Sequence, residues 1–295
     1  MDTKLTGKTR IESDLIGARE IPAEALYGVQ TLRGIENFSI SKFRLSEYPL
    51  FIKGLAITKM AAAMANFELG LLTVEQKDAI IAACGEIIDG KHHDQFPVDM
   101  IQGGAGTTTN MNANEVIANR ALELMGHERG EYQYCSPNDH VNCSQSTNDA
   151  YPTAIHIGMY FKHLQLLPHL EELIASFRKK GEEFSQIIKM GRTQLEDAVP
   201  MTLGQTFNGF ASILQDEIAH LNEAAADFLV VNMGATAIGT GICAEPGYAE
   251  KCIAALREIT GWGYPSLLRF GRSYLGYFLL GRLCFCHEAG LREDE

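Results

Sequence analysis

The chain has 295 residues, of which 46% are hydrophobic and 21% are charged, and its formal net charge is −12 at pH 7. This composition is ordinary for a soluble globular protein, and the length allows one large domain or two smaller ones. The negative charge argues against nucleic acid or an anionic membrane as the main partner. It leaves room for a small anionic substrate, because the field of a site can differ from the net charge.

Targeting and redox features predict a cytoplasmic protein. Residues 1–8 contain no apolar segment of a signal peptide, and no uninterrupted apolar run reaches the length of a membrane span. The seven cysteines are an odd number without a zinc-type Cys-x-x-Cys pair, which favours reduced thiols. Cys284-Phe-Cys286-His287 has the wrong spacing for zinc, and we expect His92 and His93 to be solvated loop residues. No metal site is therefore expected.

The first third of the chain predicts a mixed segment followed by two helices. Residues 1–49 combine short apolar pieces with Gly and Pro, which indicates loops with one or two short strands. Residues 50–69 are rich in Ala, Leu, Ile and Met, which favours a helix that ends at Gly70. Thr73-Val-Glu-Gln76 has the form of a capping box, so a second helix should run from there to Gly90.

A Gly- and Thr-rich stretch at residues 102–115 precedes a helix predicted at 116–125. Its glycines let the backbone approach a ligand closely, and threonines and asparagines follow them. The spacing matches neither a dinucleotide fingerprint nor a Walker phosphate loop, because no Gly-Lys-Ser/Thr is present. A nucleotide is therefore disfavoured, and a small anion stays open.

A second polar stretch, residues 142–153, places Ser, Thr, Asn and Gln before a long apolar-periodic segment. Such residues favour helix starts, and Pro152 fits the first turn of a helix. A site of this kind offers hydroxyls, amides and the positive end of a helix dipole to an anion. Most such clusters are only helix caps. The functional interpretation of this one is favoured because similar polar stretches occur elsewhere in the chain.

Two long helices are predicted next, at residues 153–190 and at about 201–232, with a third polar stretch at 191–200 between them. The apolar stripe of the first continues on both sides of Pro168, which should kink that helix rather than end it. The stripe of the second is typical of bundle packing. The stripes consist of Leu167, Leu170, Ile174, Phe177, Phe184 and Ile188, and of Leu203, Phe207, Phe210, Leu214, Ile218, Leu221, Ala225 and Phe228.

The last part of the chain changes character. Residues 233–241 form a Gly/Thr-rich turn, and residues 246–260 favour another helix that ends at Gly261. Residues 265–295 hold aromatics, Arg and two cysteines in no clear period.

Uncharged hydrogen-bonding groups thus stand beside predicted helix starts three times, at residues 106–114, 144–149 and 191–197. Long antiparallel helices can bring such stretches from different chains together. The chemistry that this favours is recognition of a small carboxylate, with donors placed for charge that develops on it.

Several longer motifs contain these stretches and follow one another in a fixed order over about residues 10–264. They are Ile21-Pro22, Tyr27-Gly-Val-Gln-Thr-Leu-Arg33, Glu36-Asn-Phe38, Gln102-Gly-Gly-Ala-Gly-Thr107, Asn110-Met-Asn-Ala-Asn-Glu-Val-Ile-Ala-Asn-Arg120, Ser144-Gln-Ser-Thr-Asn-Asp149, Gly191-Arg-Thr-Gln-Leu-Glu-Asp-Ala198 and Asn232-Met-Gly-Ala-Thr-Ala-Ile-Gly-Thr-Gly241. With these motifs the chain resembles the fumarase/aspartase superfamily, and within it the aspartate ammonia-lyases.

The resemblance implies a mainly α fold, in which a small N-terminal mixed domain is followed by an incomplete long-helix bundle of the fumarase/aspartase type. The N-terminal lyase domain would occupy residues 1–146, and the partial central helical bundle residues 147–264. In this family four subunits pool their bundles, and loops from three subunits build each active site. A homotetramer is the expected assembly, although the incomplete bundle makes assembly of this chain doubtful.

The activity implied by the resemblance is the reversible elimination of ammonia from L-aspartate to give fumarate, without an organic cofactor. A base would remove a proton from Cβ, the adjacent carboxylate would take up the charge, and ammonia would leave from Cα. The positions that match the family's substrate-binding residues are Thr107, Ser146, Thr147, Asn148, Thr193 and Gln194. Gln194 stands where fumarases carry His, and it would only hydrogen-bond because Gln cannot exchange protons as His can.

One family motif does not occur in these residues. The family's catalytic base is a serine in a loop reading Gly-Ser-Ser-x-Met-Pro-x-Lys-x-Asn-Pro, which is not found among the 295 residues, so no catalytic residue is assigned. The family pattern stops near Tyr264, and residues 265–295 are expected to be out-of-frame or misjoined peptide. Alone, the chain is expected to show little or no turnover and poor solubility.

Two other functions stay open. One is class II fumarate hydratase, which is disfavoured by Gln194 and by Tyr27-Gly28, where fumarases usually have Trp-Gly. The other is a non-catalytic helical fragment that associates with intact lyase subunits.

Overall fold

The computed structural model describes residues 7–265 of the chain. The predicted tail beyond residue 265, with Cys284-Phe-Cys286-His287, lies outside the described residues. Within this range the chain forms two compact units: one holds the residues up to Met159 and again from Leu229, and the other is Tyr160–Phe228. The domain boundaries expected after residues 146 and 264 stay predictions.

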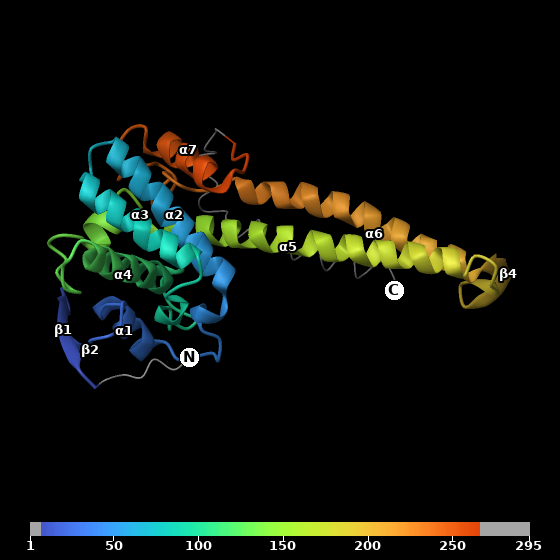
Figure 1. Ribbon diagram of the computed structural model, residues 1–295, viewed down its shortest axis with the longest axis horizontal. Helices are drawn as coiled ribbons and strands as arrows, with labels where there is room; N and C mark the ends of the chain where they lie inside the picture. Colours follow the sequence, from blue (N-terminus) through green and yellow to red (C-terminus); the bar gives the residue numbers. More distant parts are fainter. Residues whose placement is uncertain (1–6, 266–295) are drawn as a thin grey trace. The chain divides into compact units, whose positions relative to one another are not determined.

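The described chain is mainly α-helical, as predicted, with two small antiparallel sheets (Figure 1). Strand β1 (Thr9–Asp14) pairs with β2 (Gly17–Pro22), which confirms the strands expected near the N-terminus. Helix α1 (Val29–Asn37) is absent from the sequence prediction, because its N-cap residue Gly28 has no capping side chain. Short 3-10 turns lie at Leu45–Glu47 (η1), His93–Gln95 (η2) and Asp227–Leu229 (η4), and a π turn lies at Pro137–Val141 (η3).

Three helices build most of the core of the first unit: α2 (Pro49–Glu68), α3 (Val74–Ile88) and α4 (Thr107–Leu124). The bounds of α2 and α3 confirm the sequence prediction, and both halves of the Thr73–Gln76 capping box are formed. The helices bury branched side chains such as Ile52 completely. The hydrophobic effect of this burial holds the unit together.

Helix α2 is the one helix in the described range that is long and apolar enough, by length and composition, to cross a membrane. In its most apolar window, however, 67% of the residues are buried inside the protein. It packs against both α3 and α7 (Tyr248–Thr260), and α7 ends at Gly261 as predicted, with a φ of 72°. This is the burial of a core helix.

The start of α4 corrects the sequence prediction. The helix begins at Thr107 and not near Val116, so the polar run from 107 to 115 is helical rather than a loop. Its asparagine side chains are buried, and those of Asn110 and Asn112 donate to other segments; Asn112, for example, donates to the Gln95 carbonyl at 3.0 Å. Tertiary contacts therefore outweigh the modest helix propensity of asparagine.

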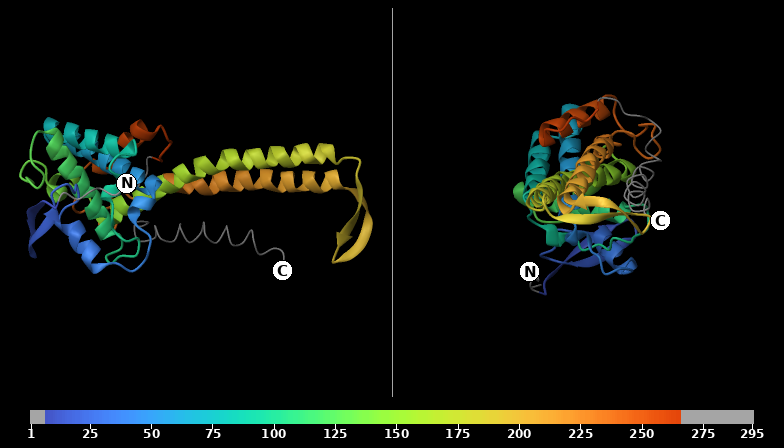
Figure 2. Two further views of the ribbon diagram at one scale, coloured as in Figure 1. Left: turned by 60° about the horizontal axis from the view of Figure 1, so that its bottom comes forward. Right: turned by 90° about the vertical axis from the view of Figure 1, so that its right-hand side faces the viewer.

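In the second unit two helices run side by side, as both views show (Figures 1 and 2). They are α5 (Thr147–Glu183), which enters this unit at Tyr160, and α6 (Leu203–Ala226). The predicted stripes are confirmed in part: Ile174 and Ile218 are buried together with Ala211, and Leu167, Leu170, Phe177 and Leu214 pack against them. Two predicted members lie elsewhere, because Phe210 is exposed and Ile188 belongs to an exposed strand. Helix α5 continues through Pro168 as predicted, but it ends at Glu183 rather than near residue 190.

Residues 188–202, expected as a helix end and a polar loop, form a β-hairpin instead. Strand β3 (Ile188–Thr193) pairs with β4 (Glu196–Thr202) across the two-residue turn Gln194-Leu195. Both turn residues have positive φ, 48° and 64°, as in the type I′ turns that Asn-Gly usually makes. The prediction was wrong because neither residue carries that sequence signal.

Candidate functional site

Two of the predicted polar stretches meet in the first unit, at the N-termini of α4 and α5. The side chain of Asn110 in α4 lies 3.4 Å from Thr147 Oγ1 at the start of α5. A Cβ on Gly106, the residue before α4, would lie 2.4 Å from the ring of Tyr151 in α5. Thr107 and Thr147, the first residues of the two helices, therefore belong to one neighbourhood that contains two positive helix ends.

The loop before α4 consists of three residues with positive φ. Gly104, Ala105 and Gly106 have φ values of 74°, 49° and 94°. Backbone N–H groups in such turns form concavities that bind anions. Thr107 is exposed at the end of this loop, and its hydroxyl donates to the Gly104 carbonyl at 2.6 Å. The loop thus places the exposed Thr107 side chain beside the exposed residues Gly104 and Ala105.

The start of α5 presents three of the predicted substrate-binding residues. Ser146 and Thr147 are half-buried, and Asn148 is exposed. Asp149 Oδ2 accepts the Ser146 N–H at 2.9 Å, and Ser146 Oγ accepts the Asn148 N–H at 3.2 Å. These bonds cap the helix, so the three residues are held in a fixed arrangement.

Beneath this segment lies a buried cation that the sequence prediction missed. Lys59 of α2 has no exposed surface, and its Nζ donates to Asn142 Oδ1 and to Gln145 Oε1, both at 2.9 Å. Asn142 Oδ1 also accepts from the side chain of Asn110, at 3.1 Å. Burial lowers the pKa of Lys59 to about 7. Its one sequence signal is a lysine in the middle of an Ala-rich apolar helix.

A third segment, the Gly/Thr-rich turn at 232–241, fixes the start of α5 from another side. Asn148 Nδ2 donates to the Ala237 carbonyl at 2.6 Å. The backbone N–H of Thr236 donates to the buried carboxylate of Asp149, whose pKa burial raises to about 7. The turn belongs to the motifs that carry the family resemblance, and these contacts give it a physical role.

The two remaining predicted residues lie in the second unit. Thr193 ends β3, and Gln194 is the first residue of the hairpin turn; both are exposed. An ion pair between Arg192 and Asp197, at 3.0 Å, links the strands beside them. The structure therefore brings Thr107, Ser146, Thr147 and Asn148 together in one unit and places Thr193 and Gln194 at a hairpin tip in the other.

The two neighbouring histidines are not solvated loop residues as expected. His92 and His93 are half-buried, with a ring nitrogen of His92 at 2.9 Å from the Glu86 carboxylate and one of His93 at 2.9 Å from the Ile87 carbonyl. Within residues 7–265, no group of three or more His, Cys, Asp or Glu side chains is arranged to hold a metal ion.

Comparisons with known proteins agree on one family. The model of a family described as Lyase matches residues 17–269. Aspartate ammonia-lyase from Pseudomonas canavaninivorans is 57% identical over 253 residues, which cover 85% of this chain and 53% of that protein. Aspartate ammonia-lyase from Escherichia coli is 53% identical over 259 residues, which cover 88% of this chain and 54% of that protein. The chain spans about half the length of the curated relatives it matches.

Solved structures give the same result for the fold. The fumarate lyase:delta crystallin of Brucella melitensis bound to cobalt has a TM-score of 0.88 and 51% identity, over 90% of this chain and 58% of that one. The recombinant class II fumarase of Schistosoma mansoni has a TM-score of 0.82 and 36% identity, over 86% of this chain and 53% of that one.

Proposed function

The chain belongs to the lyase family whose model it matches over most of its length, and from this membership we propose that it acts as an aspartate ammonia-lyase. The reaction is the reversible elimination of ammonia from L-aspartate to give fumarate. The names of the curated relatives at 53–57% identity support this choice of substrate.

The observation that carries the proposal is that the N-terminal turns of α4, which begins at Thr107, and of α5, which begins at Thr147, contact each other through Asn110 and Thr147. A dicarboxylate needs donors and positive potential, and helix ends with hydroxyl and amide groups supply both without a charged side chain at the surface. Such a local field would let a chain of net charge −12 bind a dianion.

In the proposed reaction these donors act on the carboxylate next to Cβ. Loss of the Cβ proton moves negative charge onto that carboxylate, and donors already in place stabilise this charge more than that of the ground state. Ammonia then leaves from Cα. Thr193 and Gln194 would bind the substrate from the hairpin of another subunit, and Gln194 would serve as a hydrogen-bonding group only. No residue is assigned as the base.

The proposed assembly is the family's homotetramer. Apolar side chains remain exposed along the helices of the second unit, including Phe210 at 47% and Ile213 at 61% exposure. Exposed apolar side chains on a bundle helix are suited to packing against further helices. Association with intact lyase subunits would cover the same faces, so it is the second candidate function for this chain.

The experiment that tests the function uses the purified chain with L-aspartate, with fumarate plus ammonium, and with fumarate alone. Turnover is followed by the ultraviolet absorbance of fumarate, and binding by protein-detected NMR. Ammonium-dependent consumption of fumarate supports the proposed activity, whereas binding of both dicarboxylates without turnover supports the proposed substrate site alone. Conversion of fumarate in water without ammonium would identify a fumarase, and failure to bind either dicarboxylate would overturn the site.

Matched variants localise the binding. Thr147→Val removes the hydroxyl with little change of shape, and we expect it to weaken binding by about tenfold, because a hydrogen bond to a charged group is lost. Ser176→Ala is the control: Ser176 lies on the exposed part of α5, where its hydroxyl bonds only to the Glu172 carbonyl. Equal effects of the two variants would argue against the site.

A further inference from the structure

Lys59 is a buried cation that the proposed chemistry does not touch. It lies in the middle of α2, an apolar and Ala-rich helix, and has no surface exposed to solvent. Removing an ammonium group from water costs several kcal/mol unless partners compensate for it. Hydrogen bonds or charges of its neighbours must therefore offset this cost, and an apolar residue of the same length could not make those interactions.

The partners of Lys59 identify what is gained. The Nζ group of Lys59 donates to two side-chain carbonyl oxygens of one short segment, Asn142 Oδ1 and Gln145 Oε1, each at 2.9 Å. The Gln145 amide in turn donates to the carbonyls of Val141 and Cys143 at 3.0 and 3.1 Å. One ammonium group thus holds both ends of the turn that precedes α5.

The same segment is supported further along α2. Asn66, two helical turns after Lys59, is fully buried, and its Nδ2 donates to the Cys143 carbonyl at 2.9 Å. Ser144 has a φ of 59°, an uncommon backbone conformation for a residue other than Gly, Asn or Asp. A turn with this strain needs external contacts to persist.

The other charged and titratable groups that interact with Lys59 come from three elements. Asp149 lies at the start of α5, and its carboxylate favours the charged form of Lys59; Cys84 in α3 and Cys252 in α7 are also near, but burial raises the pKa of both thiols and keeps them neutral. Tyr248 of α7 interacts with both Cys252 and Asp149. The carboxylate of Asp149 is buried and caps the Ser146 N–H, so a buried acid and a buried base hold the two ends of one segment.

We propose that Lys59 is a positioning residue. Its ammonium group holds the Asn142–Gln145 turn in place by hydrogen bonds, and this turn positions the next three residues, Ser146, Thr147 and Asn148. The assignment of those three residues to substrate binding rests on the proposed function. The mechanical role of Lys59 does not, because it follows from contacts within the chain.

Hydrogen–deuterium exchange of the purified chain tests the proposal without any substrate. Lys59→Met fills the space of the lysine with an apolar side chain and removes the ammonium group. We expect backbone amides of residues 142–148 to exchange at least about tenfold faster, a larger increase than elsewhere in the first unit, while the loss of the cation beside buried acceptors lowers the global unfolding midpoint. Thr58→Val is the control, because Thr58 is also buried in α2 but its hydroxyl bonds only to the Gly54 carbonyl.

A second variant covers the case that Asp149, left without its cation, prevents Lys59→Met from folding. The double variant Lys59→Met/Asp149→Asn restores the charge balance, and rapid exchange of residues 142–148 is expected in it as well. In Asp149→Asn alone, protection of the segment, corrected for intrinsic rates, should fall as pH rises through the titration of Lys59. In the double variant this pH profile should be flat.

The outcomes separate this proposal from the proposed function. Wild-type protection of residues 142–148 in any folded Lys59 variant, or a pH profile that survives the loss of the lysine, would show that Lys59 only fills the core. Local loss of protection in a chain that binds no dicarboxylate would retain the positioning role and reject the lyase assignment.

Discussion

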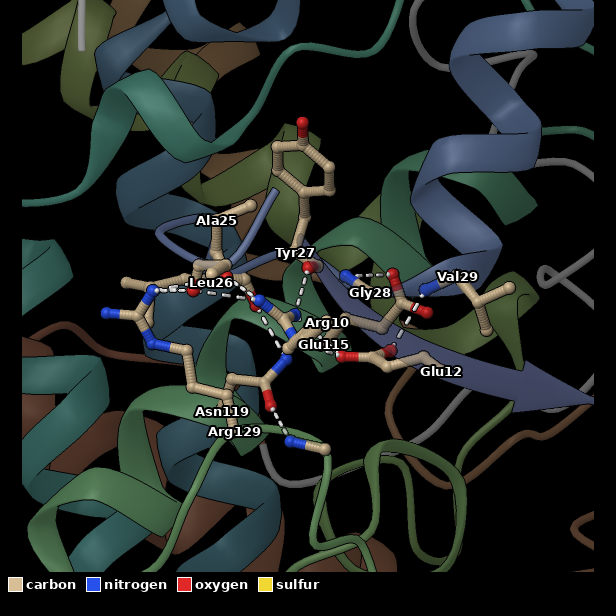
Figure 3. A network of polar contacts seen from close by, with 12 residues as sticks. Arg10, Glu12, Ala25, Leu26, Tyr27, Gly28, Val29, Glu115, Asn119 and Arg129 are labelled. Carbon is tan, nitrogen blue, oxygen red and sulfur yellow. Dashed lines mark hydrogen bonds and ion pairs between the residues drawn. The ribbon is translucent and has the colours of Figure 1, made fainter. Parts of the chain in front are cut away.

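The backbone N–H of Gly28 donates a hydrogen bond to Glu115 Oε2 at 2.9 Å, so a carboxylate of α4 caps a helix whose N-cap residue lies 87 residues earlier in the chain. The N–H groups of Gln30 and Thr31 donate to the same carboxylate, at 2.8 and 3.0 Å. Val29 N–H donates to Glu12 Oε2 at 3.1 Å (Figure 3). The first four N–H groups of α1 are therefore bound by two buried carboxylates in place of a local cap.

The first prediction concerns this cap. Glu115→Gln keeps the size of the side chain but replaces one acceptor oxygen by a donor that faces N–H groups. We expect it to lower the free energy of unfolding by about 2 kcal/mol, because buried donors lose their partner. Urea unfolding measures the change. Glu36→Gln, in an exposed ion pair with Arg19, serves as the control and should change stability by less than about 0.5 kcal/mol.

The second prediction concerns the close approach at Gly28. A Cβ there would lie 2.6 Å from Glu12 Oε2 and 2.7 Å from Tyr132 Oη. Because Glu115 Cδ would also lie at 2.8 Å, three packed groups must shift, and Gly28→Ala should destabilise the chain by about 2–3 kcal/mol. Gly85→Ala is the matched control: Gly85 lies inside α3 with nothing near its Cβ position, and this change should stabilise by about 0.5–1 kcal/mol. Equal thermal shifts for both variants would contradict the geometry.

The third prediction is a pH dependence. Arg120 donates to both oxygens of Glu86, at 2.6 and 2.8 Å, and with His92 it lowers the pKa of this carboxyl to about 2 from 4.5. Because the pKa of this carboxyl is lower in the folded state, its charged form stabilises the folded state at pH values above the pKa of the unfolded chain. This stabilisation is lost as the pH falls from about 4.5 to about 2.

Glu86→Gln should accordingly reduce the free energy of unfolding by about 1–2 kcal/mol near neutral pH, with the difference from wild type vanishing near the folded pKa. Unfolding followed at several pH values measures this difference. The control is Glu20→Gln, an exposed position in β2. A difference that stays constant with pH would mean that Glu86 acts through packing rather than through its charge.

The fourth prediction concerns the hairpin that carries Gln194. Leu195 is fully exposed at 100% and has a φ of 64°, so it has backbone strain and little packing. Leu195→Gly should stabilise the hairpin by about 0.5–1 kcal/mol, because glycine adopts positive φ without steric cost. Leu195→Ala, which keeps the strain, should leave stability unchanged, and amide exchange across β3 and β4 measures both.

How much of this protein could be predicted from its sequence depends on the range of the interactions. Helices α2, α3 and α7 were predicted within a few residues, because an apolar composition, the Thr73 capping box and Gly261 are local signals. The motifs that carry the family resemblance are local as well. The prediction that the three polar stretches recognise a small carboxylate also rested on the sequence alone.

What only the tertiary structure decided depends on residues far apart in the chain. Helix α1 has no local cap, and its start is fixed by Glu115, which no pattern around residue 28 reveals. The asparagines of α4 favour a loop when considered locally, but buried partners make them helical. Lys59 became a candidate positioning residue only when Asn142 and Gln145 were found at its Nζ. Local propensities amount to tenths of a kcal/mol per residue, whereas a buried charge or an unpaired amide costs several times more, so long-range contacts determined these positions.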